Sequence, residues 1–202
     1  MGQIKVSRCP IEGLYIIEPT LHRDARGYFM ETYNQKDMQE SGLYMNFVQD
    51  NQSMSEKGVL RGMHYQKNHP QGKLIRVIRG SVYDVAVDIR RESKTFAQWY
   101  GVELTEENKK EFYIPEGFAH GFLVLSDMAE ICYKVTDFHY PDDECGLLWN
   151  DPEIGIQWPQ LAESCSETEN GIKKYRMRDG TELKLSDRDQ KWLTLKDIIN
   201  NN

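Results

Sequence analysis

The 202-residue sequence has few cysteines and no long apolar run. Its four cysteines form neither a CxxC pair nor a zinc-finger spacing, so they predict reduced thiols rather than a disulfide framework. No apolar stretch approaches the length of a membrane-spanning helix, and the first residues, MGQIKVSRCPIEG, lack the apolar segment of a signal peptide. These absences predict a cytoplasmic protein with no membrane partner.

Positive charge is also scarce, because 25 Lys and Arg residues face 32 Asp and Glu residues and give a formal net charge of -7. An acidic chain gains little from nucleic-acid phosphates, so we expect no nucleic-acid partner. An anionic substrate would need a local cluster of arginine and lysine, because the overall field opposes its binding. The hydrophobic fraction of 39% and the length fit an ordinary globular protein with a single domain, residues 1–202.

Helical patterns are few, and short alternating runs broken by Gly, Pro and Asp dominate the chain. The strongest strand is predicted over 81–89, where Tyr83, Val85 and Val87 share one face. Across Gly80 it follows a second run, which predicts a hairpin. The other predicted strands are 73–79, the pair 121–125 and 129–136, and the weaker runs 15–17, 28–33 and 46–49.

Two segments have helical patterns. Residues 34–40 predict a short helix, and residues 186–199 predict a C-terminal helix with Ser186 as its N-cap. A polar stretch, 162–182, precedes the second helix and is interpreted as an excursion from the domain. Many short strands with few helices predict an all-β sandwich or barrel.

Two polar motifs interrupt this pattern. In the first, LRGMHYQ, the side chains of Arg61, His64 and Gln66 point toward one face if the strand slips at Gly62. The second, PEGFAHGF, places His120 in a PxGxxH sequence, which resembles the turn-and-strand signature of the cupin jelly-roll barrel.

Metal-binding cupins carry two histidines, as HxH, in the first motif. Here that slot is His64-Tyr65-Gln66, so only one of the two ligands is present and we expect no metal site.

Several stretches in order resemble the dTDP-4-dehydrorhamnose 3,5-epimerases, a family of cupin-fold nucleotide-sugar enzymes. They run nearly continuously from about Tyr15 to Pro159. The stretches are DARGYFMETYN, FVQDNQSMS, GVLRGMHYQ, QGKLIRVIRGSVYDVAVDIRRESKTFAQWYGVELTEENKK, YIPEGFAHGFLVLSD, AEICYKVTDF and DECGLLWNDPEIGIQWP. The resemblance implies a jelly-roll domain that works without a cofactor, as a homodimer, on a nucleoside-diphosphate 4-keto-6-deoxy sugar.

The implied reaction is inversion at C3 and C5, whose protons are acidified by the neighbouring C4 ketone. In this resemblance His64 matches the base, Lys73 the cation that stabilises the enolate oxygen, and Tyr133 the acid that returns the proton. Asp189, in the string LSDRD, matches a carboxylate that orients the base. An N-terminal turn of the last helix would also explain this aspartate.

The resemblance also implies a set of substrate-binding residues, with the nucleoside recognised partly by the second subunit. Guanidinium groups suit phosphate oxygens, whereas an arginine is more often in a surface salt bridge. The matching residues are Arg26, Glu31, Gln49, Asp50, Asn51, Arg61, His120, His139, Glu144 and Arg188.

Two departures from the family pattern bear on substrate choice. Arg188 stands where the family usually has lysine, and His139 stands where it often has a tyrosine that stacks on thymine. These departures bear on the nucleotide base more than on the reaction.

Other functions remain as alternatives on the same fold: a single-position epimerase, a ketoisomerase on a related nucleotide sugar, a metal-dependent cupin oxygenase, and a non-catalytic sugar-binding cupin.

Overall fold

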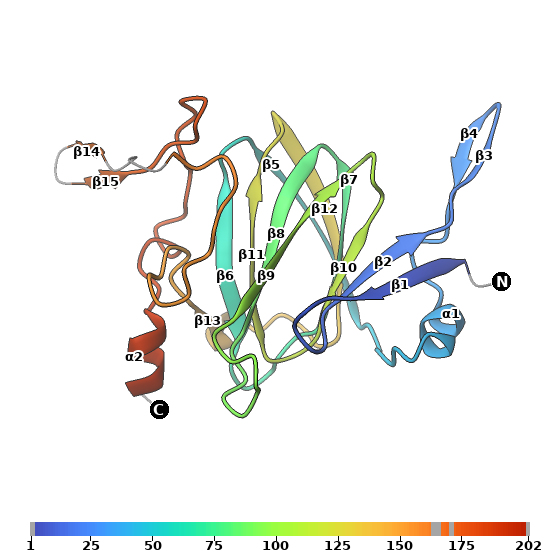
Figure 1. Cartoon of the computed structure of the whole chain (residues 1–202), viewed down its shortest axis with the longest axis horizontal. Coiled ribbons are helices and arrows are strands. Elements are labelled where there is room, and N and C mark those ends of the chain that lie inside the picture. Colours follow the sequence, from blue (N-terminus) through green and yellow to red (C-terminus); the bar gives the residue numbers. More distant parts are fainter. Residues whose placement is uncertain (1–2, 163–166, 170–171, 201–202) are drawn as a thin grey trace.

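The computed structural model describes residues 3–162, 167–169 and 172–200. Two antiparallel sheets face each other, as Figure 1 shows, and their strands come from alternating parts of the chain. The six-stranded sheet contains, in spatial order, β1 (Ile4–Arg8), β2 (Tyr15–Pro19), β10 (Glu111–Ile114), β7 (Lys73–Arg79), β12 (Met128–Val135) and β5 (Gln49–Glu56). The five-stranded sheet contains β13 (Glu144–Gly146), β6 (Leu60–Gln66), β11 (Phe118–Val124), β8 (Ser81–Asp88) and β9 (Trp99–Thr105). The all-β, jelly-roll prediction is confirmed.

The remaining elements are short. One small hairpin projects away from the sandwich and carries Arg26 in its turn (Figure 1). The small elements are β3 (His22–Asp24), β4 (Gly27–Phe29), β14 (Glu167–Glu169), β15 (Ile172–Lys174), the helices α1 (Gln35–Glu40) and α2 (Leu195–Asn200), and the 3-10 helix η1 (Pro141–Asp143). Each α-helix has six residues, and within the described ranges no helix is long and apolar enough to cross a membrane.

The predicted strands at 15–17, 73–79, 81–89, 121–125 and 129–136 are confirmed, but the two predicted hairpins are wrong. β7 and β8 lie in different sheets, as do β11 and β12. At Gly80 the chain has φ 75° and crosses between sheets, and a Cβ there would lie 2.0 Å from the carbonyl oxygen of Met128. Alternation identified the strands, but their pairing depends on contacts far along the chain.

Three further predictions need correction. The run 28–33 forms only the end of β4, and 46–49 is extended chain until β5 begins at Gln49. The predicted helix at 186–199 is helical only in α2. Residues 187–190 instead form a turn in which Ser186 Oγ accepts a hydrogen bond from the Asp189 amide, and the Asp189 side chain accepts hydrogen bonds from His64 and Trp192. The helix at 34–40 is confirmed, with Asn34 capping the backbone amides of its first turn.

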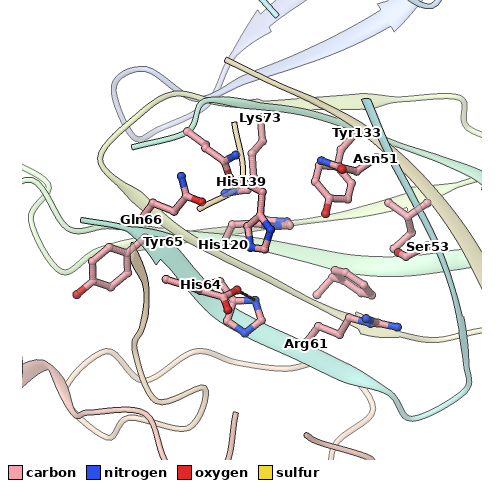
Figure 2. Close-up of a pocket in the computed structure, with 14 residues that line it drawn as sticks. Asn51, Ser53, Arg61, His64, Tyr65, Gln66, Lys73, His120, Tyr133 and His139 are labelled. Carbon is pink, nitrogen blue, oxygen red and sulfur yellow. Dashed lines mark ion pairs between the residues drawn. The ribbon is translucent and has the colours of Figure 1, made fainter. Parts of the chain in front are cut away.

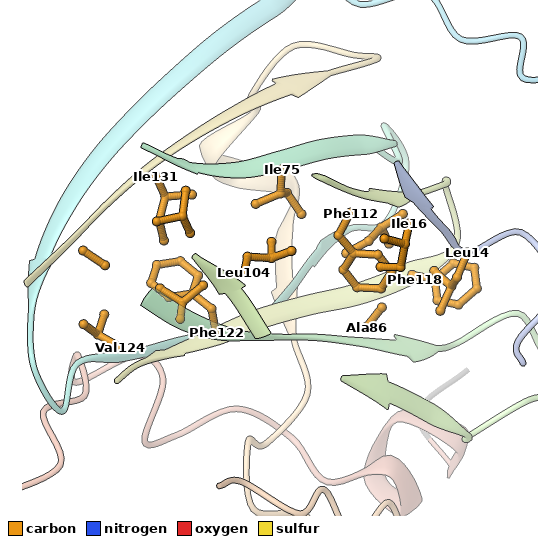
Figure 3. Packing of buried hydrophobic residues seen from close by; sticks show 14 of the residues in the cluster. Leu14, Ile16, Ile75, Ala86, Leu104, Phe112, Phe118, Phe122, Val124 and Ile131 are labelled. Carbon is orange, nitrogen blue, oxygen red and sulfur yellow. The ribbon is translucent and has the colours of Figure 1, made fainter. Parts of the chain in front are cut away.

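Both faces of the five-stranded sheet are covered. Phe112, Phe122 and Ile131 belong to the core between the sheets (Figure 3). A second core packs Val85 and Val87 of β8 against the segment from Leu147 to Leu195. The turn 187–190 within this segment, called the C-terminal turn below, lies against β6. Part of the predicted excursion at 162–182, namely 163–166 and 170–171, lies outside the described residues.

Candidate active site

A cavity of about 300 Å³ lies between the two sheets. It exists because β5 turns small polar side chains, Asn51 and Ser53, toward the interior where an apolar core would need larger ones. Its lining comes from both sheets and from the segment after β12. The lining residues are Asn51, Ser53, Arg61, His64, Tyr65, Gln66, Gln71, Lys73, His120, Phe122, Ile131, Tyr133, His139 and Glu144.

An irregularity in β6 places two of these side chains on the same wall. Phe122 of β11 pairs with Arg61, and His120 pairs with His64, so the register shifts between them. The strands approach closely here, because a Cβ on Gly62 would come within 2.5 Å of the Gly121 Cα. The slip predicted at position 62 is therefore confirmed, and Arg61 and His64 both line the cavity.

His64 is held by a buried carboxylate from the C-terminal turn. Its Nε2 lies 2.5 Å from Oδ1 of Asp189, whose residue is 3% exposed. Burial raises the pKa of Asp189, but hydrogen bonds from His64 and Trp192 outweigh it and hold the pKa below its ordinary value. An ionised carboxylate only accepts hydrogen bonds, so His64 donates through Nε2 and keeps Nδ1 free.

A lysine and a tyrosine face this histidine from the six-stranded sheet. Figure 2 shows Lys73 and Tyr133 extending toward the wall that carries His64 and Arg61. Burial lowers the pKa of Lys73 to about 8, although the carboxylates of Asp84 and Glu144 act in the opposite direction. Burial also raises the pKa of Tyr133, which the charge of Arg61 partly counteracts. The lysine is therefore a cation that can lose its proton close to neutral pH.

The sequence interpretation missed a second histidine–aspartate pair. His120 Nε2 lies 3.0 Å from both carboxylate oxygens of Asp84, a fully buried residue of β8. Burial raises the pKa of Asp84, and the charge of His120 opposes that rise. A carboxylate in the middle of the strongest predicted strand was the available signal. This pair fixes the ring of His120 at the cavity wall.

Gln66 of the first polar motif, to which the sequence assigned no role, is buried and orders the segment that carries His139. Gln66 donates hydrogen bonds to the carbonyls of His69 and Phe138 and accepts one from the amide of Tyr140. Gln49 accepts a hydrogen bond from the His139 amide and donates to Asn51. These contacts hold the segment that brings His139 to the cavity lining.

Several predicted binding residues lie elsewhere in the chain. Arg26 is exposed at the tip of the β3–β4 hairpin and pairs with Asp24, while Glu31 accepts a hydrogen bond from Asn34. Asp50 lies on the outer face of β5 and pairs with Lys134. A single chain therefore does not bring these three predicted residues to its own cavity.

Arg188 lies in a crevice on the other side of His64, together with Asp189 and Glu144. It donates a hydrogen bond to the Glu144 carboxylate. In the described part of the chain, no three His, Cys, Asp or Glu side chains gather where they could hold a metal ion. The cavity lining includes a histidine, the cationic side chains of Lys73 and Arg61, and the phenol of Tyr133.

Comparison with known proteins assigns this arrangement to a family. The sequence model of the dTDP-4-dehydrorhamnose 3,5-epimerases matches residues 8–197. The chain is 54% identical to the dTDP-4-dehydrorhamnose 3,5-epimerase of Methanothermobacter thermautotrophicus over 159 aligned residues. The alignment covers 79% of this chain and 86% of that protein. The chain belongs to the dTDP-4-dehydrorhamnose 3,5-epimerase family.

Solved structures resemble this member of the dTDP-4-dehydrorhamnose 3,5-epimerase family along nearly its whole length. The dTDP-6-deoxy-D-glucose-3,5-epimerase of Legionella pneumophila, in complex with dTDP-4-keto-L-rhamnose, is 44% identical with a TM-score of 0.83, covering 96% of this chain and 93% of that one. A 3'-monoepimerase from Streptomyces bikiniensis, in complex with dTDP-quinovose, is 32% identical with a TM-score of 0.80, covering 96% and 89%.

Proposed function

We propose that this chain epimerises C3 and C5 of dTDP-4-dehydro-6-deoxy-D-glucose to give dTDP-4-dehydro-L-rhamnose. The observation that supports the proposal is the arrangement of four side chains. His64, oriented by Asp189, faces Lys73 and Tyr133 across a cavity between the sheets. Membership of the epimerase family supports the same substrate class.

The reaction begins with proton removal beside the C4 ketone. The free Nδ1 of His64 accepts the proton from C3 or C5, and general-base catalysis of this kind contributes about 10²–10⁴-fold. The electron pair moves onto the C4 oxygen, where the Lys73 ammonium stabilises the developing enolate. Tyr133 then donates a proton to the same carbon from the opposite face, which inverts the centre. After each inversion His64 carries one extra proton and Tyr133 lacks one, so loss of the first proton to solvent and uptake of the second from solvent restore both residues.

Binding of the rest of the substrate is assigned to the remaining polar groups. Arg61 donates to Ser55 Oγ at 2.9 Å and can place its guanidinium beside the diphosphate, where bidentate contact is favourable. We assign His120 and Asn51 to the sugar and His139 to the thymine base of the nucleotide. Glu144 and Arg188 complete the wall next to His64.

We also propose a homodimer in which each cavity receives a residue from the partner chain. The projecting β3–β4 hairpin exposes Tyr28 at 48% and Phe29 at 63%, and it carries Arg26 away from its own cavity. Apolar side chains on a projecting hairpin favour burial against a second copy. The free thiols of Cys9, Cys132 and Cys145 fit a cytoplasmic location.

Mixing two inactive variants tests the shared cavity. Arg26→Ala should inactivate the partner's site and His64→Asn its own, so hybrids formed after mixing should recover activity. Light scattering gives the mass of each species. A monomer with full activity, or a mixture with no recovered activity, would contradict the shared site.

The decisive experiment for the reaction is incubation with dTDP-4-dehydro-6-deoxy-D-glucose in D2O, followed by NMR of the sugar. Deuterium at both C3 and C5 and an L-configured product are expected. The likeness to a 3'-monoepimerase supports a second candidate, which would exchange one position only. No exchange at either carbon would reject both.

A further inference from the structure

Glu144 lies between the proposed base and a cation. Its Oε1 is 4.0 Å from His64 Nδ1, and its Oε2 accepts a hydrogen bond from Arg188 Nη1. We propose that Arg188 is a positioning residue that holds the Glu144 carboxylate back from His64, so that Nδ1 stays unprotonated and open to the substrate. This inference rests on the proposed function, because it concerns the readiness of the base.

The distance explains why such a residue is needed. At 4.0 Å the Glu144 oxygen is beyond hydrogen-bond range of Nδ1, and a small rotation of the side chain would bring it within range. Asp189 already accepts from Nε2, so a protonated His64 would then donate to carboxylates on both sides. Charge-assisted bonds of this kind strongly favour the protonated ring. A ring held in that state has no nitrogen left to accept a proton from carbon.

The turn that carries Arg188 has anchors besides the Arg188–Glu144 ion pair. Trp192 packs so closely on β13 that a Cβ on Gly146 would lie 2.2 Å from its ring. The indole nitrogen of Trp192 also donates to Asp189 at 3.0 Å. The Arg188 side chain is 58% exposed, and that of Glu144 only 19%. The ion pair thus sets the position of the half-buried Glu144 charge, while the Trp192 contacts, including that of the Arg188 guanidinium over its ring, hold the segment.

Other charges around His64 stay in place when Arg188 or Glu144 is changed. The titratable and charged groups that line the cavity and the adjoining crevice with His64 are Asp189 and Arg188 from the C-terminal turn, Glu144 from β13, His120 from β11, Arg61 and Tyr65 from β6, Lys73 from β7, Tyr133 from β12, His139 and Lys184. Among these described groups, only Glu144 combines a negative charge with an oxygen 4.0 Å from the free nitrogen.

The test follows the titration of His64 in the protein without substrate. Ring signals of 15N-histidine-labelled protein are recorded against pH, and the signal that disappears in His64→Asn identifies the ring. In Arg188→Gln the His64 signals should titrate about one pH unit higher than in the unaltered protein, as expected for a carboxylate brought into contact. Arg188→Lys, which keeps the charge, should restore most of the original titration.

The double variant Arg188→Gln/Glu144→Gln separates charge placement from structure. It also lacks the ion pair, but it has no carboxylate to trap the ring, so its His64 should titrate as in the unaltered protein or at lower pH. Circular dichroism checks that each variant is folded. The pH at which kcat/KM falls on the acid side should likewise be higher in Arg188→Gln than in the unaltered protein or the double variant.

Two results would overturn the inference. One is an Arg188→Gln titration within about 0.3 pH units of the original, and the other is a double variant that stays shifted like the single one. Because the titration needs no turnover, it is read separately from the proposed reaction. If the protein exchanges no deuterium into the sugar, the proposed function is rejected. The titration of His64 still decides whether Arg188 keeps the Glu144 carboxylate from the ring.

Discussion

His64 Nε2 donates to Asp189 Oδ1 at 2.5 Å, although 125 positions separate the two residues in the sequence. The carboxylate is buried and fixes the ring proton on Nε2, which leaves Nδ1 for the substrate. The C-terminal segment thus completes a site whose other residues come from the sandwich. The tautomer of the base depends on this one contact.

Replacing Asp189 with Asn should therefore slow the reaction with little effect on binding. The amide can donate to Nε2 and move the ring proton to Nδ1, so we expect kcat to fall by about 10²–10⁴-fold. Initial rates of epimer formation give kcat and KM. Asp187→Asn, an exposed change in the same turn, is the matched control. An Asp189→Asn enzyme with nearly unaltered kcat would contradict the orienting role.

Tyr133→Phe should separate proton removal from inversion. His64 still withdraws the proton and can return deuterium to the same face, so exchange should persist while epimer formation falls by about 10²–10³-fold. NMR in D2O measures both rates in one sample. His64→Asn should lose exchange and inversion together, whereas Tyr113→Phe, on the outer face of β10, should keep both. Equal losses of exchange and inversion in Tyr133→Phe would argue against the tyrosine as the acid.

The sequence predicted the strands better than their partners. Alternation identified β8 and β12, since local side-chain periodicity is a property of each strand alone. The two hairpins were wrong because pairing depends on burial: β8 has apolar side chains on both faces and lies inside its own sheet. No local signal distinguishes a turn that joins paired strands from one that crosses between sheets.

The site was predicted unevenly for a similar reason. His64, Lys73, Tyr133 and His120 were assigned by family resemblance, and the structure brings them to one cavity. Asp84 was missed because its partner is 36 residues away and no motif links the two. The helix expected from Ser186 was wrong because the same Ser and Asp spacing also suits a tight turn whose carboxylate points inward. Arg26 was assigned to the substrate by resemblance, but in its own chain it lies on the β3–β4 hairpin away from the cavity.

Lys73 should give the reaction an alkaline limb. Burial lowers its pKa to about 8, so the ammonium loses its proton as the pH rises through that value. The neutral amine stabilises the enolate less, and kcat/KM should fall above about pH 8, since this ratio reports groups of the free enzyme. Rates between pH 6 and 10 test this. Lys73→Arg should be slower at every pH but lose that limb, because guanidinium stays charged. If kcat/KM of Lys73→Arg falls at the same alkaline pH, the alkaline limb belongs to another group.

Glu111 should make the folded protein less stable as the pH rises. It lies on the outer face of β10, 1% exposed, and in the described structure neither carboxylate oxygen has a hydrogen-bond partner. Burial raises its pKa from 4.5 to about 8, although the charges of Arg76 and Lys134 oppose the rise. Between these values the folded chain keeps a proton that the unfolded chain has released, so unfolding becomes easier as the pH increases.

Glu111→Gln removes that titration. The free energy of unfolding of the variant should therefore increase relative to that of the unaltered protein between pH 5 and 8. The gain should reach about 2–4 kcal/mol and then stay level, because above pH 8 both states of the original chain are ionised. A buried amide without partners adds a cost of about 1–3 kcal/mol at every pH, so the informative quantity is the slope of the Tm difference, not its sign at one pH. Thermal unfolding by circular dichroism from pH 5 to 9 measures it. Glu103→Gln, at an exposed position of β9, is the control and should give a flat difference. A flat difference for Glu111→Gln as well would mean that this carboxyl ionises normally in the folded protein.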